Sequence, residues 1–228
     1  MSQIFRNRSS SLTMVVLVVM TILIVQSAIS YSTTFGALAG LVQGWDATGL
    51  PAAGLGLRVV LAVVIVALWL LDRKRALFKT IIVVNVLLTI GLSINLASLI
   101  TVLFGVTPKV VRVLLTDVVL MAVSNVLIFS IWYWIIDPPG VEEVAREDEP
   151  WDFLFPQRAS VIPHYETWLP HFSDYLFLAF TTSFAFSPTD TLPLTRRAKM
   201  VMLLQSSISL ITITGIAGSA INLLAGGS

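Results

Sequence analysis

Long apolar runs separated by short polar breaks make up most of this chain. Five runs are long enough to cross a membrane, at residues 11–30, 54–71, 80–104, 111–136 and 200–224. A helix needs about 20 apolar residues to cross roughly 30 Å of hydrocarbon. Backbone groups cannot stay unpaired there, so each run is expected to form a helix. The runs also lack the short alternating pattern of a membrane β-barrel.

A shorter apolar stretch, DYLFLAFTTSFAF at residues 174–186, precedes the last run. It is too short to span a membrane and too apolar for an exposed loop, whereas a re-entrant half-helix fits its length. Ser173 or Asp174 is expected to cap its start, and Pro188 to end it. Irregular backbone at membrane depth is tolerated only where protein buries it or where it lines a wet cavity. Residues 187–191, SPTDT, are therefore expected at a protein interior or an aqueous vestibule.

The pattern predicts an all-α integral membrane protein with five transmembrane helices and a short re-entrant half-helix before the last one. Three regions follow: a four-helix transmembrane region at 1–136, a polar acidic and proline-rich loop at 137–172, and a pore-like region at 173–228. The first run follows Arg6 and Arg8 and taken alone resembles a signal peptide. Four further spans favour a retained helix.

Composition supports a membrane protein. The chain has 228 residues, of which 56% are hydrophobic and 12% charged, against about a quarter charged in soluble domains. The net charge of +1 argues against a nucleic-acid partner, since no basic field is available to hold phosphates. The absence of cysteine removes disulfides, thiolate metal sites and cysteine nucleophiles. The lipid bilayer is the expected surrounding.

Basic residues predict the orientation. If the N-terminus is cytoplasmic, six basic residues fall inside, and only Lys109 and Arg112 flank the turn on the other side. The six are Arg6, Arg8, Arg73, Lys74, Arg75 and Lys79. Cytoplasmic loops carry the excess of Lys and Arg, so the N-terminus and the loop at 137–172 are expected in the cytoplasm.

The C-terminal part resembles a potassium-channel pore. A short helix, a polar turn ending in Asp190, then Pro193, Thr195 and a final helix follow one another from Tyr175 onward. The channel filter itself does not match, because AFSPT at residues 185–189 stands where the glycine filter would be. Backbone carbonyls and permissive glycines make such a filter, so a potassium-selective ring is not expected. In the usual channel the loop enters from outside, whereas the basic residues here place it inside.

The wider chain resembles a bacterial family of uncharacterised multi-pass membrane proteins. The resemblance rests on NVLIFSIWYWIIDPPG at 125–140, DFLFPQ at 152–157 and FAFSPTDTLPLTRRAKMVMLLQSSISL at 184–210. Members are often described as channel-like because of the pore-type C-terminus, and the resemblance to a bacterial multi-pass family implies a location in the inner membrane. The resemblance implies no specific activity.

Two functions compete. The first is a channel-like protein that assembles as a homo-oligomer, with a tetramer expected. It passes ions or small solutes through a filter that is not selective for potassium. Its candidate pore or ion-binding residues are Thr182, Ser183, Phe184, Phe186, Ser187, Thr189 and Asp190. The second is a non-conducting scaffold, or a partner- or lipid-binding protein that uses the loop at 137–172. Asp190 is alternatively a turn carboxylate that pairs with Arg196 or Arg197.

Other polar residues suit packing more than chemistry. Asn85, Asn95, Asn125 and Gln205 are expected to join helices by hydrogen bonds, and Trp132, Tyr133 and Trp134 to form an interfacial belt. Asp117 is either a relay group or the partner of Arg112. DFLFPQ is expected to dock on the helix ends. The acidic loop and the spacing of His164 and His171 give no metal site, and no catalytic or cofactor motif occurs.

Overall fold

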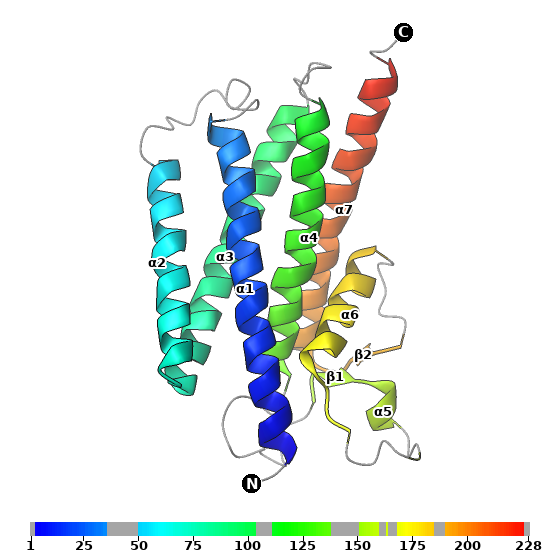
Figure 1. The fold of residues 1–228 in the computed structure, drawn as a ribbon. Helices are drawn as coiled ribbons and strands as arrows, with labels where there is room; N and C mark the ends of the chain where they lie inside the picture. Colours follow the sequence, from blue (N-terminus) through cyan, green and yellow to red (C-terminus); the bar gives the residue numbers. More distant parts are fainter. Residues whose placement is uncertain are drawn as a thin grey trace.

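The protein forms an elongated bundle of helices. The computed structural model describes residues 3–35, 50–103, 111–137, 151–159, 163, 168–184 and 190–225. Five long helices lie side by side (Figure 1): α1 (Gln3–Phe35), α2 (Leu50–Leu70), α3 (Lys74–Leu103), α4 (Val111–Ile136) and α7 (Arg196–Ala225). Four short elements gather at one end: β1 (Phe153–Leu154), α5 (Pro156–Ala159), α6 (Phe172–Phe184) and β2 (Leu192–Pro193).

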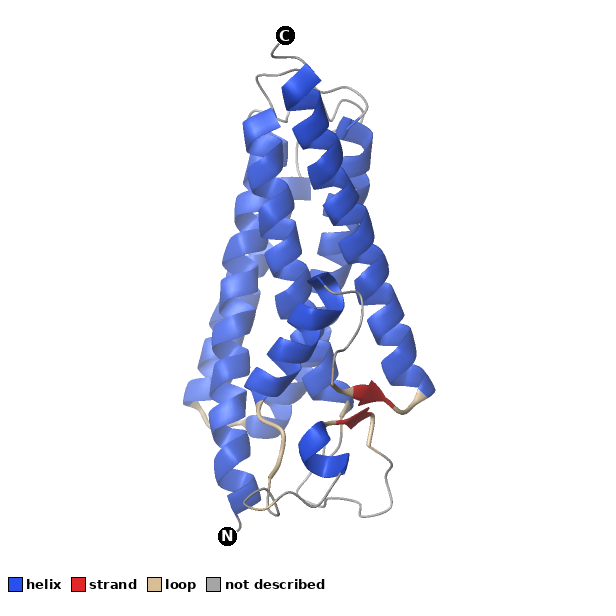
Figure 2. Cartoon of the chain, turned by 90° about the vertical axis from the view of Figure 1, so that its right-hand side faces the viewer, coloured by secondary structure: helices blue, strands red, loops and turns tan. Residues whose placement is uncertain are grey.

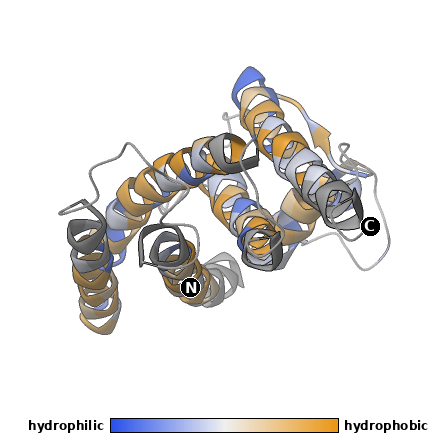
Figure 3. Ribbon diagram, turned by 90° about the horizontal axis from the view of Figure 1, so that it is seen from above, coloured by the Kyte–Doolittle hydropathy of each residue, from blue (hydrophilic) through white to orange (hydrophobic). Residues whose placement is uncertain are grey.

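Four of the long helices are long and apolar enough to cross a membrane. Their candidate spans are Leu12–Ser30, Lys74–Ile100, Leu115–Ile136 and Arg196–Gly215. The described part of α2 carries a shorter apolar stretch, Gly56–Leu70. Large apolar side chains such as Ile24 and Leu70 cover the outside of the bundle, and apolar residues follow the helices along most of their lengths (Figure 3). A mostly helical, multi-pass membrane protein accounts for such a surface, which a water-soluble protein rarely exposes.

Helix α4 is the centre of the bundle, because it packs against α1, α3, α6 and α7. This position overturns the predicted aromatic belt. Tyr133 and Trp134 are buried, and the indole N–H of Trp132 donates to Thr89 Oγ1 on α3 at 2.9 Å. A belt residue needs to face the lipid headgroups, whereas neighbouring elements surround this end of α4.

Buried amides join the helices, as the sequence predicted for Asn85. Its Nδ2 donates to the carbonyl of Ile128 on α4 at 3.2 Å. Gln26 makes a similar bond from α1 to the Leu88 carbonyl on α3 at 2.8 Å. Gly91 makes room for this amide, because a Cβ there would lie 2.8 Å from Gln26 Oε1. Small residues of this kind allow close helix contact in a membrane.

The turn between α2 and α3 ends α2 with a left-handed residue, Asp72, whose φ is 50°. The Asp72 N–H donates to the Trp69 carbonyl at 3.2 Å, and the Arg73 N–H donates to the Leu68 carbonyl at 3.1 Å. This pair of bonds is a Schellman motif, in which glycine is the favoured left-handed residue.

Asp72→Gly is therefore expected to raise the free energy of unfolding by about 0.5–1 kcal/mol. The exposed Asp72–Lys74 ion pair at 3.8 Å, which the substitution removes, contributes little. Equilibrium unfolding in mixed micelles measures the change. Asp72→Ala is the control, since it removes the same ion pair and keeps a Cβ, and it should not stabilise. A glycine variant no more stable than the alanine variant would contradict the prediction.

The polar end of the bundle carries most of the basic residues. The N-terminus, the α2–α3 turn, the two strands and the start of α7 lie at this end, and the C-terminus lies at the other (Figure 1). Strands β1 and β2 pair antiparallel, with Phe153 opposite Pro193 and Leu154 opposite Leu192. Helix α6 rises from this end beside α4 and α7 and stops well short of the opposite end (Figure 2).

Candidate functional site

Two buried carboxylates hold the polar end together, and the first is Asp137, directly after α4. Its Oδ1 accepts from the backbone N–H groups of Asp152 and Phe153 at 3.0 and 3.1 Å. Its Oδ2 accepts from the Tyr175 hydroxyl on α6 at 2.7 Å and from Arg158 Nη1 at 3.2 Å. Both oxygens are thus fully used. Asp137 ties the loop and α6 to the end of α4.

The second carboxylate, Asp152, binds the start of α7. Its Oδ1 accepts from Arg197 Nε at 2.7 Å and from the Thr195 hydroxyl, and its Oδ2 lies 2.5 Å from Arg197 Nη2. Thr195 is also the N-cap of α7, since its Oγ1 accepts from the Ala198 N–H at 3.2 Å. The backbone carbonyl of Asp152 accepts from the Leu194 N–H at 2.9 Å. We name the six residues of this network the clasp: Asp137, Asp152, Arg158, Tyr175, Thr195 and Arg197.

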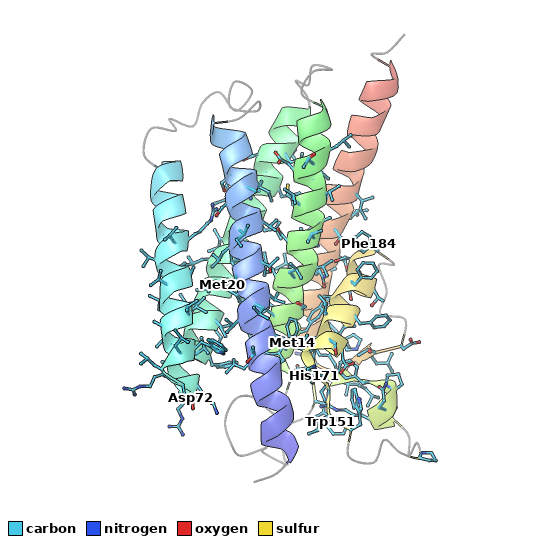
Figure 4. All side chains as sticks on the ribbon, in the orientation of Figure 1. Met14, Met20, Asp72, Trp151, His171 and Phe184 are labelled. Atoms are coloured by element: carbon cyan, nitrogen blue, oxygen red, sulfur yellow. The ribbon has the colours of Figure 1, made fainter. Side chains whose placement is uncertain are left out.

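Aromatic rings pack around the clasp. Phe153 and Phe155 are buried and meet Tyr133 and Tyr175 edge-on, with ring centroids 5.1 and 5.6 Å apart. The prediction that DFLFPQ docks on the helix ends is therefore confirmed. Trp151 covers the guanidinium of Arg158 at 4.5 Å, close to the polar end where Figure 4 labels it.

A second polar network lies inside the bundle, where α4, α6 and α7 meet. Gln205 on α7 donates from Nε2 to the Ala179 carbonyl at 2.8 Å and to Ser183 Oγ at 2.7 Å, both on α6. Its Oε1 accepts from the Tyr133 hydroxyl on α4. Asn125 on α4 donates to the Gln205 carbonyl at 3.4 Å and to Ser209 Oγ at 2.7 Å. These five side chains, Asn125, Tyr133, Ser183, Gln205 and Ser209, form the Gln205 cluster.

The Gln205 cluster confirms the predicted helix-joining role of Asn125 and Gln205. Every polar atom of the Gln205 side chain is used, which fixes α6 against α7. Asn125 Oδ1, in contrast, is buried and has no hydrogen-bond partner among the described residues, as is also true of Asn95 Nδ2 on α3. Unsatisfied buried polar atoms are uncommon and often mark a place for water or an ion.

Helix α6 has two different faces. Tyr175, Ala179 and Ser183 turn inward against α4 and α7, whereas Phe177, Phe180 and Phe184 are exposed. Phe184 lies at the far end of α6, midway along the bundle (Figure 4). The helix starts two residues earlier than predicted.

Because α6 starts two residues earlier than predicted, Ser173 and Asp174 lie inside the helix and do not precede it as caps. Asp174 lies within the first turn, where its Oδ2 accepts from the His171 N–H at 2.6 Å. This bond is the side chain to N-cap half of a capping box. Ser173 is exposed. The acidic side chain still stabilises the start of the helix, because it lies at the positive end of the dipole.

The structure separates the candidate pore residues. Thr182 and Ser183 are 1% and 3% exposed inside the protomer, whereas Phe184 and Asp190 are exposed. Phe186, Ser187 and Thr189 lie outside the described residues. Arg197, one of the two alternative partners predicted for Asp190 together with Arg196, binds Asp152. Asp117 is buried on α4, and the side chain of its predicted partner Arg112 lies outside the described residues.

The site offers binding groups and no metal-ligand cluster in the described ranges. No group of three or more His, Cys, Asp or Glu residues there could hold a metal ion. The chemistry available is that of hydrogen-bonding amides, hydroxyls and two ion-paired carboxylates. In comparisons with known proteins, no family model, curated protein or solved structure matches the chain.

Proposed function

We propose that this protein is a channel-like membrane protein that passes ions or small solutes as a homo-oligomer. In this proposal five helices cross the membrane, α2 included, and α6 is a re-entrant half-helix that enters from the cytoplasmic side with the N-terminus. The resemblance of the C-terminal part to a channel pore, and of the wider chain to a bacterial multi-pass family, supports the proposal. The half-length of α6, clasped at its start and ending midway along the bundle, is the observation that carries the proposal.

The end of α6 is suited to attract cations. With 13 residues, α6 is about 20 Å long, and its C-terminal end carries roughly half a negative charge. The sequence leaves the Phe184 carbonyl without an i+4 donor, because Pro188 has no backbone N–H. Helix C-termini of this kind coordinate cations in transporters built from broken helices. The filter need not be a ring of glycine carbonyls.

The clasp supports this role by positioning α6. Tyr175 on α6 and Thr195 and Arg197 at α7 are bound to Asp137 and Asp152, which are themselves adjacent in the network. The start of α6 and the start of α7 are thus anchored to two buried carboxylates that are joined to each other. Helices held this way keep a fixed position relative to each other, as a binding site between them requires.

The exposed faces of α6 and α7 are the proposed contact surface between protomers. Phe177, Phe180 and Phe184 form a stripe on α6, and Met200 and Leu203 are among the exposed apolar residues of α7. Copies that meet through this face around an axis place Asp190 near the mouth of the pore. Phe186, Ser187 and Thr189 remain predicted lining residues.

Cation flux into liposomes that contain the purified protein tests the proposal. Asp190→Asn is expected to lower the flux by about two- to fivefold at low salt, because a carboxylate at the mouth concentrates cations. The difference should shrink at 1 M salt, where the Debye length is about 3 Å. Asp72→Asn is the matched control, since Asp72 is exposed at the polar end of the bundle (Figure 4). Absence of flux at every voltage would reject the channel.

The lack of cysteine allows a second arm of this experiment. In a conducting protein, Phe184→Cys should lose flux when a membrane-impermeant thiol reagent is added on the side of the N-terminus. Leu70→Cys is the control, because Leu70 is an exposed apolar residue on α2. Equal block of both variants would contradict a pore mouth at α6.

A non-conducting scaffold is the second candidate function. It is favoured by the burial of Thr182 and Ser183 inside one protomer, where Ser183 serves Gln205. In this case α6 braces the bundle, and the loop at 137–172 binds a partner or lipid. Flux absent from a correctly folded protein, together with a monomeric state, would favour this candidate.

A further inference from the structure

An arginine lies between two helices at the end of the bundle opposite the clasp. Arg58 on α2 is partly buried, and its Nη2 donates to Ser30 Oγ on α1 at 2.9 Å. Its Nη1 is buried and has no hydrogen-bond partner within the described part of the chain. A guanidinium keeps its charge under all ordinary conditions, so the free donor cannot be removed by titration.

The depth of Arg58 matters for what it can bind. It stands eight residues after the start of α2 at Leu50, and Ser30 stands five residues before the end of α1 at Phe35, so both are about 8–12 Å from the helix ends. This depth is near the boundary between headgroups and hydrocarbon, where long arginine side chains reach towards the surface. A charged residue in such a segment generally has a functional partner.

Open space lies on α2 one turn before Arg58. Side chains of a helix tilt towards its N-terminus, so Arg58 extends over the turn that contains Gly54, one turn earlier on the same face. A Cβ built on Gly54 meets no atom within 4 Å. The residue is nevertheless only partly exposed. Gly54 thus leaves open space one turn away from a charged side chain that has an unused donor.

We propose that Arg58, Ser30 and Gly54 form a binding site for a phosphate oxyanion at the seam of α1 and α2. Guanidinium groups match phosphate in geometry and charge, and the planar fork offers two parallel N–H groups to its oxygens. A neighbouring hydroxyl steadies the guanidinium. The phosphate comes either from an anionic lipid headgroup or from a free phosphate in the aqueous phase. The site is independent of conduction by α6 and α7.

Thermal unfolding of the detergent-purified full chain tests the site. Short-chain phosphatidylglycerol is expected to raise the Tm of the wild type by about 4 °C at saturating concentration. Arg58→Gln should lose this shift, and Arg58→Lys should keep only part of it, because a lysine lacks the planar fork. Arg75→Gln is the matched control, since it removes an exposed arginine at the opposite end and should keep the full shift.

A variant that retains Arg58 serves as a control for misfolding. Gly54→Leu fills the open space before Arg58, so it should lose the lipid-dependent shift while its ligand-free Tm stays close to that of the wild type. A shift also produced by inorganic phosphate assigns the site to free phosphate, and a shift given by the lipid alone assigns it to a headgroup. Asp46→Asn tests for a carboxylate partner within the chain.

Three results would overturn the proposal. The first is a wild type that shifts with neither probe. The second is an Arg58→Gln variant that shifts as much as the wild type. The third is an Asp46→Asn variant that lowers the ligand-free Tm as Arg58→Gln does, because the guanidinium would then be paired with Asp46.

Discussion

Arg158→Met is expected to lower the free energy of unfolding by about 3–5 kcal/mol, the usual cost of removing one partner of a buried ion pair. The side chains of Arg158 and Asp137 are 5% and 0% exposed, with Nη1 and Oδ2 3.2 Å apart. Removing the guanidinium leaves the Asp137 carboxylate buried without its counter-charge. Methionine keeps an apolar stem, whereas the contact of the guanidinium with the Trp151 ring at 4.5 Å is lost together with the charge.

The pH dependence of this variant separates charge from packing. Burial raises the pKa of Asp137, and the Tyr175 hydrogen bond and the charge of Arg158 oppose that rise. Without Arg158 the pKa of Asp137 rises further above the unfolded value of about 3.9. A carboxyl with a raised pKa contributes stability that is full below the unfolded pKa and is lost as pH rises through the folded pKa. The deficit of Arg158→Met should therefore be smaller at pH 5 than at pH 8.

Two further variants make this measurement decisive. Adding Asp137→Asn to Arg158→Met should restore part of the stability, because the neutral amide oxygen still accepts from the Asp152 and Phe153 N–H groups. Arg196→Met, which alters an exposed arginine, should stay within about 0.5 kcal/mol of the wild type. A deficit that is independent of pH, and that Asp137→Asn does not relieve, would assign the effect to packing.

The helices could be predicted from the sequence because the bilayer requires long apolar runs. The run at 111–136 coincides with α4. Helix α3 begins six residues before its run, at Lys74, because basic residues continue a helix beyond the apolar region. Helix α6 was predicted because its run is too short to span a membrane and too apolar for an exposed loop. The α2 stretch is shorter than the spans in the described residues, so the count of five remains a proposal.

The clasp could be predicted only in part, because its bonds join residues far apart in the chain. DFLFPQ gave an apolar signal inside a polar loop, and its docking followed from that. The partners of Asp137 and Asp152, such as Tyr175 and Arg197, depend on how α4, α6 and α7 pack. The aromatic belt failed for the same reason, since Tyr133 belongs to a helix that other elements surround. One signal for the clasp was present in the sequence and was missed: Asp137 directly follows the apolar run at 111–136.

Gln205→Leu is expected to lower the free energy of unfolding by about 2–3 kcal/mol, the second large effect. The substitution keeps the volume and removes one amide that serves both α4 and α6. Its main cost is the Tyr133 hydroxyl, which loses its acceptor while remaining buried. Ser183 can turn to a helix carbonyl, and the Ala179 carbonyl lies within α6, so both lose less.

A double-mutant cycle with Tyr133→Phe isolates that cost. Once the hydroxyl is removed, Gln205→Leu should cost about 1 kcal/mol less, because no buried donor is left unpaired. Ser207→Ala is the control on the same helix, since Ser207 is exposed and its hydroxyl donates to the Leu203 carbonyl within α7. Additive effects of Gln205→Leu and Tyr133→Phe would mean that the two side chains are not coupled. Coupling, in contrast, would establish that the Gln205 amide of α7 is joined to the Tyr133 hydroxyl of α4 in the interior of the bundle, where the same amide also contacts α6.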